Sequence, residues 1–255
     1  MKKLLLFLLL PWIIACQKDI LPDPKPEPEP EPSFVCGISK MKDIENNLYP
    51  TVPIGNQCWM KTNLRTGKYL NGDSIPAGIP DSVWPLTTTG ACAIYQHKPE
   101  NDTIYGKLYN FYAAVDPRGL CPTGWRLATD SDWNKLVKYL DADADTTFDG
   151  IGAGHYTQVG GTMIKDTTRW RPHSDPNLRP TNSSGFTALP GSNRDPNFGT
   201  FRPEGKNATW WTPSDGPDGN WGRATAYFTS WISRFKIPHG CGCSLRCVQD
   251  LNHEF

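Results

Sequence analysis

The sequence has no excess of charge of either sign, since 26 basic residues face 26 acidic residues in a chain of 255. Without a positive excess, the chain lacks the general electrostatic attraction that draws proteins to nucleic acid, and we expect no nucleic-acid partner. Charged residues make up only 20 % of the chain, whereas Gly (23) and Pro (24) are frequent. This composition excludes a helical bundle or coiled coil and favours one loop-rich globular domain.

Long hydrophobic runs are also missing. The run Leu4–Leu10 is far shorter than the ~20 residues that a membrane-spanning helix needs. It follows two lysines and precedes Ile13-Ile14-Ala15-Cys16, which is the pattern of a secretory signal. These four residues resemble the lipobox of bacterial lipoproteins, so we expect a signal peptide over residues 1–15 and lipid attachment at Cys16. A soluble secreted protein with a chance cysteine at this position is the alternative.

Residues 16–33 are predicted to form a lipidated tether. Gln17-Lys18-Asp19 partly resembles the signal that sends Bacteroidota lipoproteins to the outer face of the outer membrane. From residue 20 on, proline alternates with Asp, Lys and Glu, which excludes helix and sheet and favours extended polyproline II. We therefore expect a protein attached to the outer membrane by its lipid and exposed at the cell surface. An anchor that faces the periplasm is the alternative.

A folded domain is expected over residues 34–250, followed by a short tail at 251–255. Apolar residues at helical spacing predict two helices, one on Tyr105, Leu108, Tyr109 and Tyr112 and one on Trp133, Leu136, Val137 and Leu140. Thr129 and Asp132 supply a capping pattern for the second helix. Strands are predicted over residues 224–228, 230–237 and 245–248. Two early helices and a few late strands indicate an α+β fold.

Six blocks of sequence resemble, in the same order, the Fibrobacter succinogenes major paralogous domain. They are residues 52–64, 105–113, 121–130, 185–191, 210–214 and 244–248. The resemblance implies a C-type-lectin-like fold, as in formylglycine-generating enzymes, with two helices, small twisted antiparallel sheets, long loops and stabilising disulfides. It also implies a surface lipoprotein, and it gives architecture and location more firmly than activity.

Seven cysteines remain when Cys16 is set aside, and in an exported chain they are read first as a disulfide framework. The resemblance implies the bridges Cys121–Cys247 and Cys36–Cys58. Cys92 would then pair with Cys241 or Cys243, which leaves one thiol. The enzymes with this fold bind copper through a cysteine pair near the C-terminus, so a copper-thiolate oxidase that uses Cys241 and Cys243 is a weaker alternative.

Complete catalytic motifs are absent from the sequence. It has no two-histidine zinc helix, no Gly-x-Ser-x-Gly turn and no phosphate-cradling glycine loop, and we therefore expect no enzyme activity and no cofactor. Asp141, Asp143 and Asp145 alternate as in a calcium loop, with Asp149 beyond them. Because the Gly and Glu of such a loop are missing, we expect a solvated acidic loop, with bound calcium as the alternative.

Aromatic residues provide the clearest sign of ligand binding. Several tryptophans lie among arginines in the loop-rich second half, and exposed indole faces stack well on sugar rings and cations. We expect Trp170 and Trp221, with Arg169 and Arg223, to line a ligand surface. The expected function is non-catalytic binding or adhesion to a polysaccharide, glycoprotein or surface protein. The alternative is a structural component of a cell-surface complex or pilus.

Overall fold

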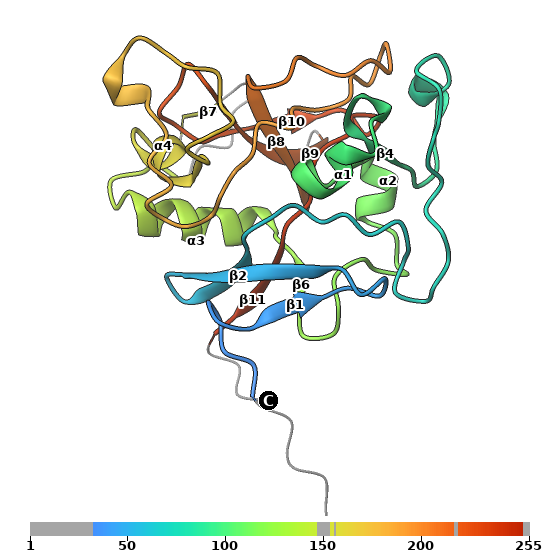
Figure 1. Ribbon diagram of the computed structural model, residues 1–255, viewed down its shortest axis with the longest axis horizontal. Coiled ribbons are helices and arrows are strands. Elements are labelled where there is room, and N and C mark those ends of the chain that lie inside the picture. The colour runs from blue at the N-terminus through green and yellow to red at the C-terminus, as the bar shows by residue number, and fades with distance from the viewer. Residues whose placement is uncertain (1–32, 147–153, 156, 217–218, 252–255) are drawn as a thin grey trace, which may run out of the picture. The chain divides into compact units, whose positions relative to one another are not determined.

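A computed structural model describes residues 33–146, 154–155, 157–216 and 219–251 (Figure 1). The predicted signal peptide, the lipid site Cys16, nearly all of the tether, Asp149 and most of the tail lie outside these residues. The described part is an α+β fold of short helices and small antiparallel sheets, as expected. None of the helices in the described residues has both the length and the apolar character of a membrane span.

A five-stranded sheet receives both described ends of the domain. Its strands, in spatial order, are β1 (Lys40–Lys42), β2 (Leu48–Ile54), β3 (Gln57–Met60), β11 (Cys247–Asp250) and β6 (Arg126–Leu127). Near the first end, Cys36 is bonded to Cys58 on β3. At the other end, the backbone N–H of Leu251 donates to the carbonyl of Asn56, next to β3. The two ends of the domain therefore lie side by side (Figure 1).

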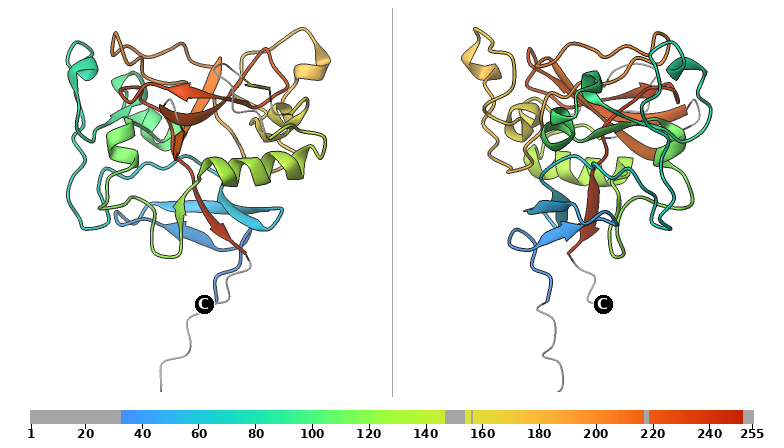
Figure 2. Two further views of the ribbon diagram at one scale, coloured as in Figure 1. Left: turned by 180° about the vertical axis from the view of Figure 1, so that it is seen from behind. Right: turned by 45° about the vertical axis from the view of Figure 1, so that its right-hand side comes forward.

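A four-stranded sheet lies in the half of the domain opposite the five-stranded sheet (Figures 1 and 2). Its strands, in spatial order, are β7 (Gly154–His155), β10 (Ser233–Ile237), β9 (Gly219–Ala226) and β8 (Asn207–Gly216). A third, two-stranded sheet pairs β4 (Cys92–Ile94) with β5 (Lys107–Tyr109). The remaining short elements are η1 (Trp84–Leu86), η2 (Tyr95–His97), α4 (Gly160–Ile164) and η3 (Pro176–Leu178).

The helix predicted over Tyr105 to Tyr112 is wrong, because three elements share this segment. They are α1 (Glu100–Tyr105), strand β5 and α2 (Phe111–Ala114). Gly106 ends α1 at φ +72°, and a Cβ there would lie 2.7 Å from the carbonyl oxygen of Leu64, so only glycine fits. Asn110 then starts α2 by accepting a hydrogen bond from the N–H of Ala113. Both boundaries exclude a continuous helix.

The second predicted helix is confirmed as α3 (Asp130–Leu140). Its capping box is complete, because Thr129 and Asp132 each accept a hydrogen bond from the other's backbone N–H. The helix buries Trp133, whose ring centre lies 5.3 Å from both Trp59 and Trp210. Aromatic contacts of this kind stabilise a core by about 0.5–1.5 kcal/mol each beyond area burial. The helix thereby joins the two larger sheets.

The three predicted late strands correspond to β9, β10 and β11, with boundaries shifted by a few residues. The strands of the first half of the domain were not predicted from the sequence. It also missed the one-turn helix α4, which lies beyond residue 141, where we expected no further helix.

Two disulfides, Cys36–Cys58 and Cys121–Cys247, are present. The expected third bridge is absent, because Cys92, Cys241 and Cys243 are buried free cysteines. Cys92 is paired with Tyr109 across the two-stranded sheet, and Tyr109 is paired in turn with Cys243. Two strand spacings separate the backbones of Cys92 and Cys243 by about 10 Å, and a disulfide needs less than about 7 Å.

Candidate functional site

The two faces of the four-stranded sheet carry different side chains, because successive residues of a strand point to opposite faces. On the inner face, Trp210 of β8, Arg223 of β9 and Arg234 of β10 are all buried. On the outer face, the register places Thr209, Ala224 and Ser233 opposite one another across β8, β9 and β10. The small alanine between two hydroxyl residues leaves a hollow on this face.

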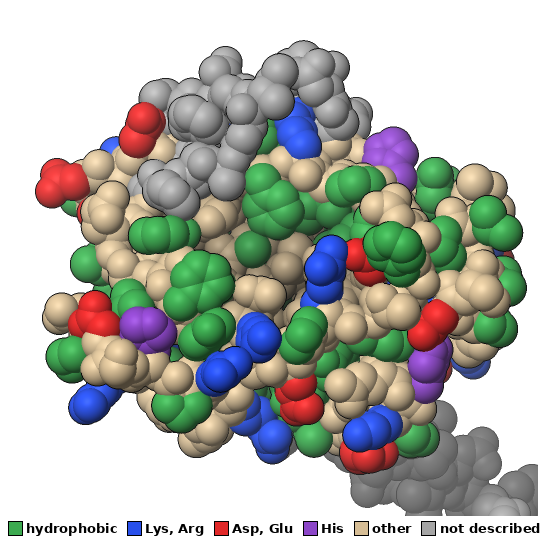
Figure 3. Space-filling view, turned by 90° about the horizontal axis from the view of Figure 1, so that it is seen from above, with side chains coloured by type: hydrophobic (Ala, Val, Ile, Leu, Met, Phe, Trp, Pro, Cys, Tyr) green, Lys and Arg blue, Asp and Glu red, His purple; other side chains and the backbone are tan. Residues whose placement is uncertain are grey.

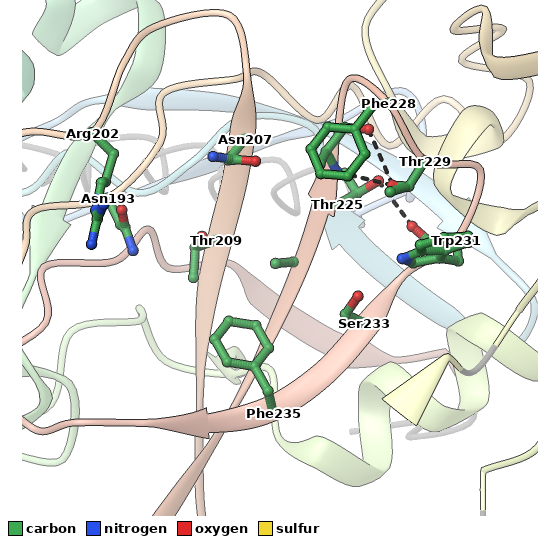
Figure 4. A pocket seen from close by; sticks show the side chains of 12 residues that line it. Asn193, Arg202, Asn207, Thr209, Thr225, Phe228, Thr229, Trp231, Ser233 and Phe235 are labelled. Carbon is green, nitrogen blue, oxygen red and sulfur yellow. Dashed lines mark hydrogen bonds between the residues drawn. The ribbon is translucent and has the colours of Figure 1, made fainter. Parts of the chain in front are cut away.

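This hollow is the floor of a pocket of about 420 Å³ that we call the sheet pocket (Figure 4). Its volume lies within the range of small-molecule sites, roughly 300–1,000 Å³. Phe228, Thr229 and Trp231 lie at one end, and Asn193 and Arg202 lie at the other (Figure 4). Asn207 and Phe235 complete the lining from the neighbouring strands. The sheet pocket therefore combines aromatic side chains with amide and hydroxyl groups.

The turn between β9 and β10 holds the aromatic end of the sheet pocket in place. Thr225 donates from its hydroxyl to the carbonyl of Trp231 at 2.9 Å, which fixes the far side of the turn. Gly161 of α4 accommodates the turn from behind, where an added Cβ would lie 2.4 Å from the carbonyl oxygen of Trp231. Its N–H also donates to the carbonyl of Ser230. Phe228, 54 % exposed, projects from this supported turn.

A buried lysine supports the same turn. The Nζ of Lys165 donates to the carbonyls of Ala226 and Thr229 at 2.8 and 2.5 Å. It also lies 5.3 Å from the ring centre of Trp170. Burial lowers the pKa of Lys165 from 10.5 to about 8, because the charged form is desolvated.

This lysine predicts a pH dependence of stability. Between about pH 8 and 10.5 the unfolded chain binds more protons at Lys165 than the folded chain does, so the free energy of unfolding rises with pH across this range. Lys165→Met removes that rise, whereas Lys98→Met, at an exposed position, keeps it. Urea unfolding at pH 8, 9 and 10 measures the effect. The buried tyrosines contribute equally to the pH dependence of all three proteins, so the difference between wild type and K165M reports on Lys165 alone. If the free energy of unfolding of wild type and K165M changes with pH in the same way, the expectation is contradicted.

Two of the predicted ligand residues are buried in the core. Trp221 is 4 % exposed and Arg223 is fully covered, so the expectation that they line an exposed surface is wrong. Arg223 donates to the carboxylate of Asp130 at 2.7 Å, and Arg234 donates to it at 2.7 and 2.8 Å. The Arg234 guanidinium in turn stacks 3.5 Å above the Trp221 ring. These residues join the sheet to α3.

The other two predicted residues lie closer to solvent. Trp170 is 7 % exposed and donates its indole N–H to the carbonyl of Ala188, yet its ring lines a second pocket on segment 167–180. Arg169 is exposed and lies near Tyr105, and it is not among the residues that line either pocket. Of the four predicted residues, Trp221 and Arg223 are therefore buried in the core, Trp170 is buried at the base of the second pocket, and only Arg169 is exposed.

The aromatic residues that line the sheet pocket were not among those predicted. Phe228 and Trp231 lie in the turn between β9 and β10, whereas the prediction placed them inside the strands 224–228 and 230–237. Aromatic residues at a turn cannot all be packed in the core, and this was the signal that could have identified them.

In the acidic loop that follows α3, the Asp141 carboxylate binds backbone groups of the protein. Asp141 accepts hydrogen bonds from the backbone N–H groups of Asp143 and Gln158, which closes its own turn. Across the described ranges, no group of three or more His, Cys, Asp or Glu side chains could hold a metal ion.

Cys241 and Cys243 approach each other to 3.4 Å between sulfur atoms and are almost completely buried.

The fold and the pocket together define a disulfide-linked α+β domain with an open aromatic and polar pocket on the outer face of its second sheet. The chain belongs to the Fibrobacter succinogenes major domain family, whose model matches residues 52–249. No curated protein and no solved structure matches the chain.

Proposed function

We propose that this protein is a non-catalytic, carbohydrate-binding lipoprotein with a C-type-lectin-like domain. In this proposal Cys16 anchors it to the outer membrane, the proline-rich segment spaces it from the lipid, and the domain faces the outside of the cell. The observation that carries the proposal is the sheet pocket, where the exposed ring of Phe228 and the half-buried rings of Trp231 and Phe235 stand beside amide and hydroxyl groups.

A sugar ring matches such a lining in two ways. Its C–H face is apolar and stacks on an aromatic ring such as Phe228. Its hydroxyls both donate and accept hydrogen bonds, as do the side chains of Asn193, Asn207 and Ser233. A purely apolar ligand would offer these polar groups no hydrogen bond in exchange for the water it displaces, which costs free energy.

The lining favours binding over catalysis. None of the described residues that line the sheet pocket is Asp, Glu, His or Cys. Glycoside hydrolysis normally needs two carboxylates beside the scissile bond, and nucleophilic catalysis needs an activated group. Elsewhere, burial raises the pKa of the Cys92 thiol to about 12, so the reactive thiolate is disfavoured. Cys241 and Cys243 are 3 % and 0 % exposed, which gives an oxidase substrate no access.

The position of the domain's ends also supports the proposal. Both described ends are held at β3, in the half of the domain opposite the four-stranded sheet (Figure 1). A chain attached through residues before Phe34 therefore leaves the pocket-bearing half away from its point of attachment. This arrangement suits a head that meets a ligand outside the cell.

The test is a glycan array probed with the purified full-length protein and two variants. We expect Phe228→Ala to lower the binding affinity roughly two- to tenfold, because it removes the stacking surface. Phe198→Ala is the matched control, since this phenylalanine is 72 % exposed and lies outside the pocket lining. No glycan binding, or equal loss in both variants, would overturn the proposal. A stoichiometric protein partner without glycan binding would instead support an assembly role.

A further inference from the structure

The second pocket, which we call the arginine pocket, has a volume of about 410 Å³ and lies on segment 167–180. Its charged and titratable lining residues are Arg171, Arg179 and His173, and its floor includes the buried ring of Trp170. No Asp or Glu occurs among the described residues that line it. In a chain of zero net charge, this is a local concentration of positive groups.

Nearby carboxylates do not neutralise this lining. Asp166 accepts hydrogen bonds from the backbone N–H groups of Thr168 and Arg169, so its carboxylate faces its own turn. Asp175 similarly accepts from the backbone N–H of Asn177 at the start of η3. Among the described residues, neither carboxylate forms an ion pair with Arg171 or Arg179. Arg171 and Arg179 are both exposed residues on the pocket lining, so an anion can reach them.

An aromatic pair connects the arginine pocket with the sheet pocket. The ring centres of Tyr227 and Phe228 lie 5.2 Å apart, and Phe228 lines the sheet pocket. On the other side, the Arg171 guanidinium lies 5.4 Å and the His173 ring 6.1 Å from the Tyr227 ring. Seen from above, Lys and Arg side chains lie among hydrophobic ones across this face (Figure 3). One extended ligand can therefore contact both pockets.

We infer that the ligand is an acidic polysaccharide, with a neutral part of the chain in the sheet pocket and a carboxylate or sulfate group in the arginine pocket. Guanidinium groups suit this role, because their planar donors form paired hydrogen bonds with carboxylate and sulfate oxygens. The Thr167 hydroxyl, also in the lining, adds a further donor. This inference rests on the proposed carbohydrate binding and specifies its chemical class.

The test uses the full-length protein and pairs of polymers that differ only in charge. The pairs are polygalacturonate with its full methyl ester, and dextran sulfate with dextran. We expect one acidic polymer to bind roughly tenfold or more tightly than its neutral partner, and raised salt to weaken that binding. Arg171→Gln/Arg179→Gln is expected to remove this preference. Arg118→Gln, at an exposed arginine outside both pockets, keeps it.

The outcomes separate this inference from the function on which it rests. Binding of neutral and acidic polymers with equal affinity, or an acid preference that survives the double arginine variant, would overturn the acidic ligand and leave carbohydrate binding intact. Binding of neutral polymers alone would do the same. Absence of binding to every polymer here and on the array would overturn both. Circular dichroism of each variant establishes that it is folded.

Discussion

The double variant Cys121→Ser/Cys247→Ser is expected to lose about 4–5 kcal/mol of unfolding free energy, or less where the unfolded chain retains structure. The bridge spans 126 residues, more than half of the domain, and its removal frees this long loop in the unfolded state. It also joins the segment before β6 to β11, so its loss weakens the β11–β6 edge of the five-stranded sheet. Guanidinium unfolding with and without reductant measures the change.

The second disulfide provides the matched control. Cys36→Ser/Cys58→Ser opens a loop of only 22 residues, for which the same reasoning gives about 3 kcal/mol. We therefore expect the order wild type, C36S/C58S, C121S/C247S in decreasing stability. Equal losses in the two variants would show that strain or residual structure, and not loop length, sets the contribution of these bridges.

Asp130→Asn is expected to cost about 3–5 kcal/mol, because it removes the carboxylate that pairs with both buried guanidinium groups, those of Arg223 and Arg234. Asp130 is 8 % exposed, and the two arginines are 0 % and 9 % exposed, so water does not replace the lost carboxylate. The expected result is a lower denaturation midpoint, read by tryptophan fluorescence because Trp221 packs on Arg234.

Asp73→Asn is the control for this charge effect. Asp73 pairs with Arg118 at 2.9 Å, but both side chains are exposed, and such surface pairs contribute only about 0–1 kcal/mol. If D130N loses as little unfolding free energy as D73N, the buried cluster contributes no more to stability than a surface ion pair does. Glycan binding by D130N is measured at low temperature, where the variant is folded. Unchanged binding there would mean that the substitution affects stability and leaves the binding face intact.

Local signals in the sequence predicted the parts of the fold that depend on near neighbours. α3 is such a case, because its cap at Thr129 and its apolar stripe lie within a dozen residues. The segment from Tyr105 to Tyr112 has the same apolar spacing, yet Tyr109 pairs with Cys243, 134 positions along the chain. Helical spacing cannot reveal a partner at that distance, and the tertiary contact prevails over the local pattern.

Proline concealed strand β2 in the sequence. Pro50 and Pro53 lie within it and indicate a loop or edge strand, although β2 lies between β1 and β3. Tyr49 and Thr51 are buried on alternate positions, which is the period-two pattern of a strand. This alternation, given more weight than the two prolines, predicts strand β2 and with it part of the five-stranded sheet.

The pocket on the four-stranded sheet lies in the segment that the sequence analysis singled out, but other side chains of this segment line it. Trp221 and Arg223 belong to the Trp- and Arg-rich segment, but Arg223 finds its carboxylate partner on α3, 93 residues earlier. A sequence cannot show whether an arginine turns to solvent or to a distant buried acid. Phe228, in contrast, is exposed because it follows the end of β9, where the sheet offers no neighbour to cover it.

The short disulfide has a mechanical consequence. Tension that enters the domain through the backbone before Phe34 reaches Cys36 and crosses the covalent bond to Cys58, bypassing the residues between them. β1 and β2 are thus a closed loop that bears no load. If the proposed lipid tether were pulled, force would pass through this bond directly into β3, and the hairpin of β1 and β2 would not be unfolded first.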